Sequence, residues 1–248
     1  EVIEISQGID NVTVGDRVAI EPALGCVVRG FTEPCNSCLE GRYANCSRST
    51  KGDISAGLQT GFCQSLPGGW GEIMLAHESQ IHKIPDRFSL EAAVLLEPLS
   101  CAIHGVLRSK VTGRGPVLVV GCGAIGLMTI MALRKLEPNC EIVAMAKYPH
   151  QRSLALDLGS NIAVPTGMKG YKELSKLVKA DLRPIEFGKP IVVGGFPLIF
   201  ECVGTSSALE DAVRWVMENG TVMMQGMPSH SKIDLTPVWY KQIRLTGS

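Results

Sequence analysis

A strand that breaks into three closely spaced glycines is the feature that most constrains the fold of this chain. Residues 117–126 read VLVVGCGAIG, so four apolar residues lead directly into the glycines. A short apolar run of this kind is typical of a buried parallel strand, and the glycines permit a tight turn into a helix. We therefore expect a strand over 117–120 and a helix over about 123–136. The N–H groups at the start of that helix favour an anionic ligand.

Each glycine has a separate predicted task. Gly121 allows the turn, Gly123 lets a pyrophosphate approach the backbone, and Gly126 lets the helix pack close to the sheet. The residues of this segment predicted to contact a nucleotide are Gly121, Cys122, Gly123, Ala124, Ile125 and Gly126. A glycine-rich turn without a ligand is the alternative.

Composition excludes several classes of protein. The 248 residues carry 24 basic and 24 acidic side chains, which gives no electrostatic footprint for a nucleic acid or an anionic membrane. No uninterrupted apolar stretch reaches the roughly 18 to 20 residues that span a bilayer, and no signal peptide is recognisable. Nine cysteines without an export signal favour a reducing compartment, so we expect a cytoplasmic protein.

The residue pattern changes near position 85. The segments 16–20, 72–76 and 80–84 read as short alternating strands among glycine-rich turns, which predicts a β-rich, barrel-like domain. Beyond them the predicted strands are 117–120, 141–146, 198–203 and 220–225, and the predicted helices are 123–136, 149–159, 169–179 and 206–218. This alternation predicts a parallel, doubly wound sheet. Helical stretches at 89–96 and 98–109 lie between, and we place the domain boundary between residues 96 and 97.

Four cysteines lie within 21 residues, with the spacing C-x8-C-x2-C-x7-C. They are Cys26, Cys35, Cys38 and Cys46. A C-x2-C pair brings two thiolates within reach of one metal ion, and two more complete a closed tetrahedral shell. We predict a structural zinc site in the segment 26–46. The alternative is that these cysteines are free thiols without a metal. A zinc ribbon that binds nucleic acid is disfavoured, because the segment has few basic and aromatic residues.

Glu97 precedes Pro98, which favours the first helical position, so we expect Glu97 to be the N-cap of the following helix. The helix dipole there favours an ionised carboxylate. The apolar neighbours of Glu97 predict partial burial, which requires a partner for its charge. Cys101 and His104 follow at helical spacing, and we interpret them as packing residues rather than metal ligands.

The ends of the other predicted strands bear on the cofactor. An acid that binds the ribose of NAD is expected at the end of the second strand, where the chain has Ala146 followed by Lys147 and Arg152. The two bases suit a 2′-phosphate and favour NADP over NAD, although both could be solvated surface charges. Val203, Gly204 and Gly226 follow later strands and are predicted to contact the nicotinamide half. The missing acid also counts against a methyltransferase that uses S-adenosylmethionine.

The order of motifs resembles the zinc-dependent medium-chain alcohol dehydrogenases, especially the branch of sorbitol, threonine and glucose dehydrogenases. The motifs are the cysteine lobe followed by GGWGEIMLAH, LLEPLSCAIHG, VVGCGAIG, FECVG and IDLTPVWYKQIRLTGS. The resemblance implies a GroES-like domain over 1–96 and a Rossmann domain over 97–248. It assigns Cys35, Cys38 and Cys46 as structural zinc ligands. The family's first ligand position falls on Thr32, so Cys26 would replace it through a longer loop.

The resemblance also implies an activity, the transfer of a hydride between a secondary alcohol or polyol and NAD(P)⁺. Glu97 matches a position that approaches the catalytic zinc, directly or through its water. The family's other catalytic ligands, a Cys and a Gly-His-Glu segment, have no match, so we expect a fragment, truncated at both ends and inactive alone. A carbonyl reductase and a non-catalytic cofactor-binding homologue remain alternatives. The full-length protein is expected to be a dimer or tetramer acting on a small alcohol or carbonyl compound.

Overall fold

The computed structural model describes residues 1–248 except 112, 114, 187 and 228–229. The described chain divides into two compact units, Glu1–Glu97 and Pro98–Ser248. Each unit has its own secondary structure and its own clusters of buried residues.

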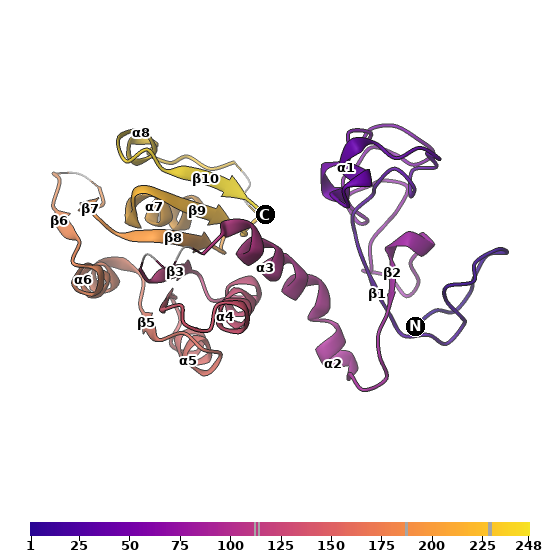
Figure 1. Ribbon diagram of the computed structural model, residues 1–248, viewed down its shortest axis with the longest axis horizontal. Coiled ribbons are helices and arrows are strands. Elements are labelled where there is room, and N and C mark those ends of the chain that lie inside the picture. The colour runs from indigo at the N-terminus through magenta and orange to yellow at the C-terminus, as the bar shows by residue number, and fades with distance from the viewer. Residues whose placement is uncertain (112, 114, 187, 228–229) are drawn as a thin grey trace. The chain divides into compact units, whose positions relative to one another are not determined.

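The second unit is built on a six-stranded sheet in which every neighbouring pair is parallel, in the order β10-β9-β8-β3-β4-β5. Its strands are β3 (Val117–Val120), β4 (Ile142–Met145), β5 (Ile162–Val164), β8 (Phe196–Glu201), β9 (Val216–Met224) and β10 (Arg244–Gly247). The chain winds outward from β3 through β5, returns to β8 beside β3, and then winds outward in the other direction (Figure 1). This confirms the predicted doubly wound sheet, whose strand order reverses between β3 and β8.

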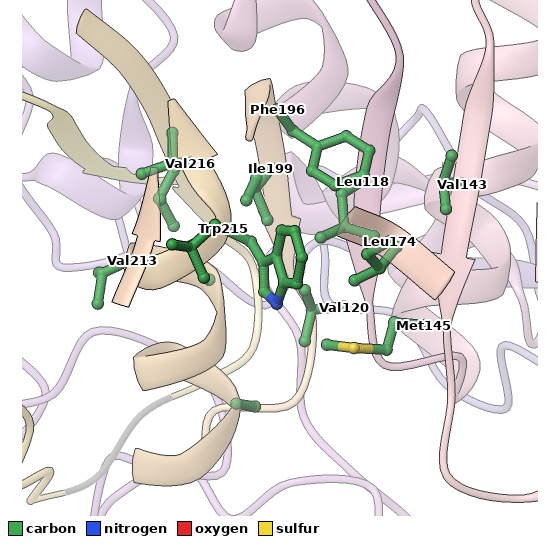
Figure 2. Packing of buried hydrophobic residues seen from close by; sticks show 14 of the residues in the cluster. Leu118, Val120, Val143, Met145, Leu174, Phe196, Ile199, Val213, Trp215 and Val216 are labelled. Atoms are coloured by element: carbon green, nitrogen blue, oxygen red, sulfur yellow. The ribbon is translucent and has the colours of Figure 1, made fainter. Parts of the chain in front are cut away.

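Helices cover both faces of this sheet, and they therefore bury the alternate residues of β3 that point to opposite faces. Leu118 and Val120 pack in a cluster with side chains of α6 and α7, whereas Val117 and Val119 pack with side chains of α3, α4 and α5. These helices are α3 (Leu96–Ser109), α4 (Ala124–Leu136), α5 (Pro149–Asp157), α6 (Gly167–Val178) and α7 (Ser206–Trp215). Figure 2 shows Trp215, the largest fully buried side chain, among the apolar residues of the first cluster.

Some predicted boundaries in this unit were wrong. The helix predicted over 206–218 ends at Trp215, and β9 starts directly at Val216, before the predicted strand at 220–225. β9 pairs with β8 from Val216 onward, with an irregular register, and this pairing takes the place of the last predicted helical turn. The sequence reasoning also missed β5, β10, α8 (Thr236–Tyr240) and a two-stranded hairpin of β6 (Asp181–Arg183) and β7 (Ile191–Val193).

The first unit has less regular structure. Its two strands, β1 (Val18–Ile20) and β2 (Ile81–Lys83), pair in antiparallel fashion and confirm two of the three predicted strands. Its short helices are α1 (Asn36–Leu39), the 3-10 turns η1 (Tyr43–Asn45) and η2 (Glu78–Gln80), and α2 (Leu90–Ala93). The strand predicted at 72–76 was wrong: its apolar Ile73 and Leu75 are exposed, and no described strand pairs with it.

The stretch Leu90–Ser109, which contains α2 and α3, has by length and composition the properties of a helix that could cross a membrane. It is not an uninterrupted apolar run. The criterion is weak evidence, since core helices of globular proteins also meet it. The stretch carries Glu91, Glu97 and Arg108, and the residues at 94–95 form a turn between the two helices.

Candidate nucleotide-binding cleft and metal centre

A cleft of about 790 Å³ opens in the second unit at the carboxyl ends of β3, β4 and β8. Ligands of doubly wound sheets bind where the strand order reverses, and this cleft lies at that point. Its lining includes the glycine turn after β3, the loop after β4, the start of α6 and the first half of α7. Among the residues that line it are Gly121, Cys122, Gly123, Lys147, Tyr171, Lys189, Val203, Ser207 and Asp211.

The glycine turn has the geometry that its sequence predicts. Gly121 has a φ of +88°, which a residue with a side chain rarely adopts. A Cβ at Gly126 would overlap the carbonyl oxygen of Gly121, so this glycine lets α4 approach β3 closely. A Cβ at Gly123 would meet nothing within 4 Å, and no side chain among the described residues caps α4 there. The backbone at Gly123 is therefore accessible to a phosphate.

Only the first half of the predicted turn reaches the cleft. Gly121, Cys122 and Gly123 line it, whereas Ala124, Ile125 and Gly126 are absent from the described lining. Cys122 is buried, and this burial raises the pKa of its thiol to about 12. The Cys122 side chain is accordingly neutral, and it contributes to packing beneath the turn.

The two predicted bases after β4 have different positions. Lys147 lines the cleft, and its ammonium lies 5.4 Å from the centre of the Tyr148 ring. Arg152 does not appear in the described lining; its guanidinium donates hydrogen bonds of 3.0 Å to the carbonyl oxygens of Ala146 and Lys147. Arg152 thus fixes the loop that carries Lys147, because its Nη1 donates to two main-chain carbonyl oxygens of that loop.

A buried carboxylate that the sequence reasoning missed organises the end of β8. Glu201 is 1% exposed, and its Oε1 accepts hydrogen bonds from the N–H groups of Val203 at 2.8 Å and Gly204 at 3.0 Å. Burial raises its pKa above the ordinary value for a glutamate. Val203 lines the cleft, while Gly204 and Gly226 do not appear in the described lining. A Cβ on Gly226 would overlap the backbone of Val203 and Gly204, so Gly226 supports the turn from behind.

A second polar group in the lining also escaped sequence reasoning. The Tyr171 hydroxyl donates a hydrogen bond of 2.8 Å to Asp211 Oδ1, and Lys189 Nζ donates one of 2.5 Å to the same oxygen. These residues come from α6, the segment before β7 and α7, and they are far apart in sequence. No spacing pattern connects them, so only the fold reveals the group.

The structure brings the four predicted cysteines of the first unit together. The sulfur atoms of Cys26, Cys35, Cys38 and Cys46 all lie within 4.8 Å of one another. Three backbone N–H groups donate hydrogen bonds to these sulfur atoms, at N–S distances of 3.3 to 3.4 Å. The N–H of Cys26 donates to Cys38 Sγ, that of Cys35 to Cys26 Sγ and that of Arg48 to Cys46 Sγ. Such bonds orient thiolate ligands and stabilise their charge, so the donor set fits a tetrahedral zinc ion.

The surroundings of these thiols differ. Burial raises the pKa of Cys38 to about 12 and also raises that of Cys46. A hydrogen bond from Ser47 lowers the pKa of Cys35 to about 5. A metal ion bound here must displace the protons of the buried thiols, which makes its affinity depend on pH.

Two expectations for Glu97 were wrong. It is the second residue of α3 rather than the N-cap, since the helix already begins at Leu96. It is also exposed, like Leu95 and Leu96 before it, whereas Pro98 and Leu99 after it are half-buried. The structure does not group Glu97 with Cys101 and His104; the cysteine cluster is the only candidate metal group among the described residues. His104 Nδ1 lies 2.7 Å from the Ser248 hydroxyl oxygen, within hydrogen-bonding distance.

Comparisons with known families cover both units. Residues 1–86 match the model of the alcohol dehydrogenase GroES-like domain, and residues 124–248 match that of the zinc-binding dehydrogenases. Among curated relatives, an L-idonate 5-dehydrogenase of Vitis vinifera is 29% identical over 98% of this chain and 60% of its own length. A sorbitol dehydrogenase of Bacillus subtilis is 27% identical over 95% and 59%. The chain thus spans less than two thirds of the length of these relatives.

Solved structures share the fold. A zinc-binding dehydrogenase from Sinorhizobium meliloti, bound to NADP, superposes with a TM-score of 0.69 at 24% identity, covering 100% of this chain and 65% of that one. An oxidoreductase of unknown specificity from Escherichia coli gives a TM-score of 0.74 at 22% identity, covering 99% and 63%. The predicted combination of a GroES-like domain and a Rossmann sheet is confirmed.

Proposed function

The chain belongs to the zinc-binding alcohol dehydrogenase family, and from this premise we propose that it forms the cofactor-binding and structural-metal part of an NAD(P)-dependent dehydrogenase. The whole enzyme would transfer a hydride between a secondary alcohol or polyol and the nicotinamide ring. The observation that carries the proposal is the cleft at the reversal of strand order, with an open glycine turn at its edge. The polyol substrate class is supported by the sorbitol and idonate dehydrogenases among the relatives.

For the cofactor, we propose NADP in preference to NAD. The end of β4 offers no acid to a ribose 2′-hydroxyl, since Ala146 is followed by Lys147. The exposed Lys147 ammonium would pair with a 2′-phosphate, while Arg152 holds the loop in place. Val203 would contact the cofactor directly, since it lines the cleft. The wider set would support the cofactor site from outside the described lining, and it consists of Ala124, Ile125 and Gly126 in α4 and of Gly204 and Gly226.

Titration calorimetry tests this preference on the 248-residue chain. We expect NADPH to bind more tightly than NADH, and Lys147→Ala to weaken NADPH binding roughly tenfold with little effect on NADH, because only the 2′-phosphate pairs with the ammonium. Lys172→Ala, a lysine of α6 outside the described lining, is the control. Tighter binding of NADH by the unchanged chain would show that the preference is wrong.

For the metal, we propose that Cys26, Cys35, Cys38 and Cys46 hold a structural zinc. A second, catalytic zinc in the whole enzyme would act as a Lewis acid that lowers the pKa of the substrate alcohol. We propose that Glu97, directly or through water, contacts that second site, which would make it a catalytic residue. Replacing Glu97 by Gln in the full-length enzyme should then lower kcat and change its pH profile while leaving NADPH affinity unchanged.

The reaction itself is tested by screening alcohols, polyols and their carbonyl counterparts with both cofactors, with the full-length enzyme. Oxidation of a polyol with NADP⁺ supports the proposal, and a strong preference for carbonyl reduction supports a reductase instead. Nucleotide binding without turnover of any compound would support a non-catalytic homologue. We also propose that the whole enzyme is cytoplasmic, because the cysteines are unpaired as in a reducing compartment. That it is a homo-oligomer is proposed from the family resemblance alone.

A further inference from the structure

One part of the cleft is lined by three polar side chains that phosphate binding at the glycine turn would not involve, those of Tyr171, Lys189 and Asp211. Asp211 projects from α7, where its Oδ1 accepts hydrogen bonds from both Tyr171 and Lys189. Lys189 Nζ also donates to the Ser207 carbonyl oxygen at 3.1 Å. Tyr171 is 2% exposed and the Asp211 side chain 10%, so the carboxylate is held firmly by buried or half-buried neighbours.

The Asp211 carboxylate can still accept a further hydrogen bond. Tyr171 and Lys189 both donate to Oδ1, and no described residue donates to Oδ2, although Asp211 lines the cleft. The charge of the group is also unfavourable to a phosphate, since the Lys189 ammonium faces two carboxylates, Asp211 and Glu210 at 3.3 Å. A neutral hydrogen-bond donor is the ligand group that this carboxylate would accept.

The same cleft contains the glycine turn, where phosphates would bind. A dinucleotide anchored there extends its adenosine half along the cleft, and adenine carries one amine as its exocyclic donor. We propose that Asp211, positioned by Lys189 and Tyr171, accepts a hydrogen bond from the adenine amine of the bound dinucleotide and thereby selects adenine. This inference rests on the proposed dinucleotide site and adds the residue that reads the base.

The test compares NADPH with its hypoxanthine analogue, in which a carbonyl oxygen replaces the amine. An acceptor would then face the Asp211 carboxylate, so the chain should bind the analogue roughly 10-fold to 100-fold more weakly by calorimetry. In Asp211→Asn the side-chain amide can donate to that oxygen, and the ratio of the two dissociation constants should approach one. Glu210→Gln is the matched control: its side chain also contacts Lys189 but is absent from the described lining, so the ratio should persist.

The outcomes separate the two proposals. Equal affinity of the unchanged chain for both compounds, or an unchanged ratio in Asp211→Asn, overturns the assignment of Asp211 while leaving the dinucleotide site intact. Failure to bind NADPH, NADH and the analogue overturns the dinucleotide site and this inference together. If circular dichroism shows that Asp211→Asn is unfolded, the two dissociation constants are compared in the unchanged chain and in Tyr171→Phe instead. Tyr171→Phe removes one hydrogen bond to Asp211, so the ratio of the two dissociation constants should be smaller in this variant.

Discussion

Lys241 is a buried cation surrounded by main-chain carbonyls rather than carboxylates. It is 1% exposed, and its Nζ donates to the carbonyl oxygens of Arg214 and Val216 at 2.8 Å. These atoms lie where α7 ends and β9 begins, so Lys241 joins the segment after α8 to that junction. Burial lowers its pKa from 10.5 to about 8, because the hydrogen bonds replace only part of its hydration.

This lowered pKa predicts a dependence of folding stability on pH. Between about pH 8 and 10.5 the unfolded chain binds a proton that the folded chain has lost, so the contribution of Lys241 to the free energy of unfolding rises with pH. Lys241→Met keeps an apolar stem and removes the titrating group. We expect the unchanged chain to gain about 3 kcal/mol relative to this variant across the window. Urea unfolding of both chains at several pH values measures the difference, and a constant difference would contradict the argument.

At the scale of elements, Gly123 at the N-cap of α4 and Gly126 in its first turn have different roles. A Cβ at Gly126 overlaps the Gly121 carbonyl oxygen, so Gly126→Ala should push α4 away from the sheet and lower the free energy of unfolding by about 1–3 kcal/mol. Gly123→Ala meets nothing within 4 Å and should leave stability nearly unchanged while weakening NADPH binding. Denaturant unfolding and calorimetry on both variants test this contrast. Equal losses of stability would show that the two positions share one role.

Elements with strong local patterns could be predicted from the sequence. The strand Val117–Val120 was predicted with its observed bounds, because an apolar run before glycines constrains the local backbone. The 72–76 segment was predicted as a strand in the same way as the segments of β1 and β2, but no described strand pairs with it. Strand pairing depends on the fold and not on the segment alone. The thiol cluster could be found from its spacing. Lys189 and Asp211 were missed because only the tertiary structure brings them together. Glu201 has its hydrogen-bond partners, Val203 and Gly204, close in sequence, and it was missed because its burial depends on the fold.

At the scale of the whole molecule, the two units differ in what holds them together. The Pro98–Ser248 unit packs two large apolar clusters against a six-stranded sheet. The Glu1–Glu97 unit has one two-stranded sheet and small clusters, of which one consists mainly of the four clustered cysteines. A two-stranded sheet is marginal by itself in water. We therefore expect a metal ion in the cysteine cluster to supply much of the first unit's stability.

Metal removal should accordingly unfold one unit and spare the other. We expect elemental analysis of the 248-residue chain to give one zinc per chain. After chelation, the backbone amides of residues 1–97 should lose their protection against hydrogen exchange, while those of β3, β4 and β8 should keep it. Cys38→Ser should give the same pattern without a chelator, since three thiolates bind zinc more weakly than four. Cys63→Ser is the control, because Cys63 is buried in the same unit but lies outside the cluster, and this variant should retain its zinc. Unchanged protection of residues 1–97 in metal-free protein would mean that packing alone holds this unit, and loss of protection in both units would mean that they unfold together.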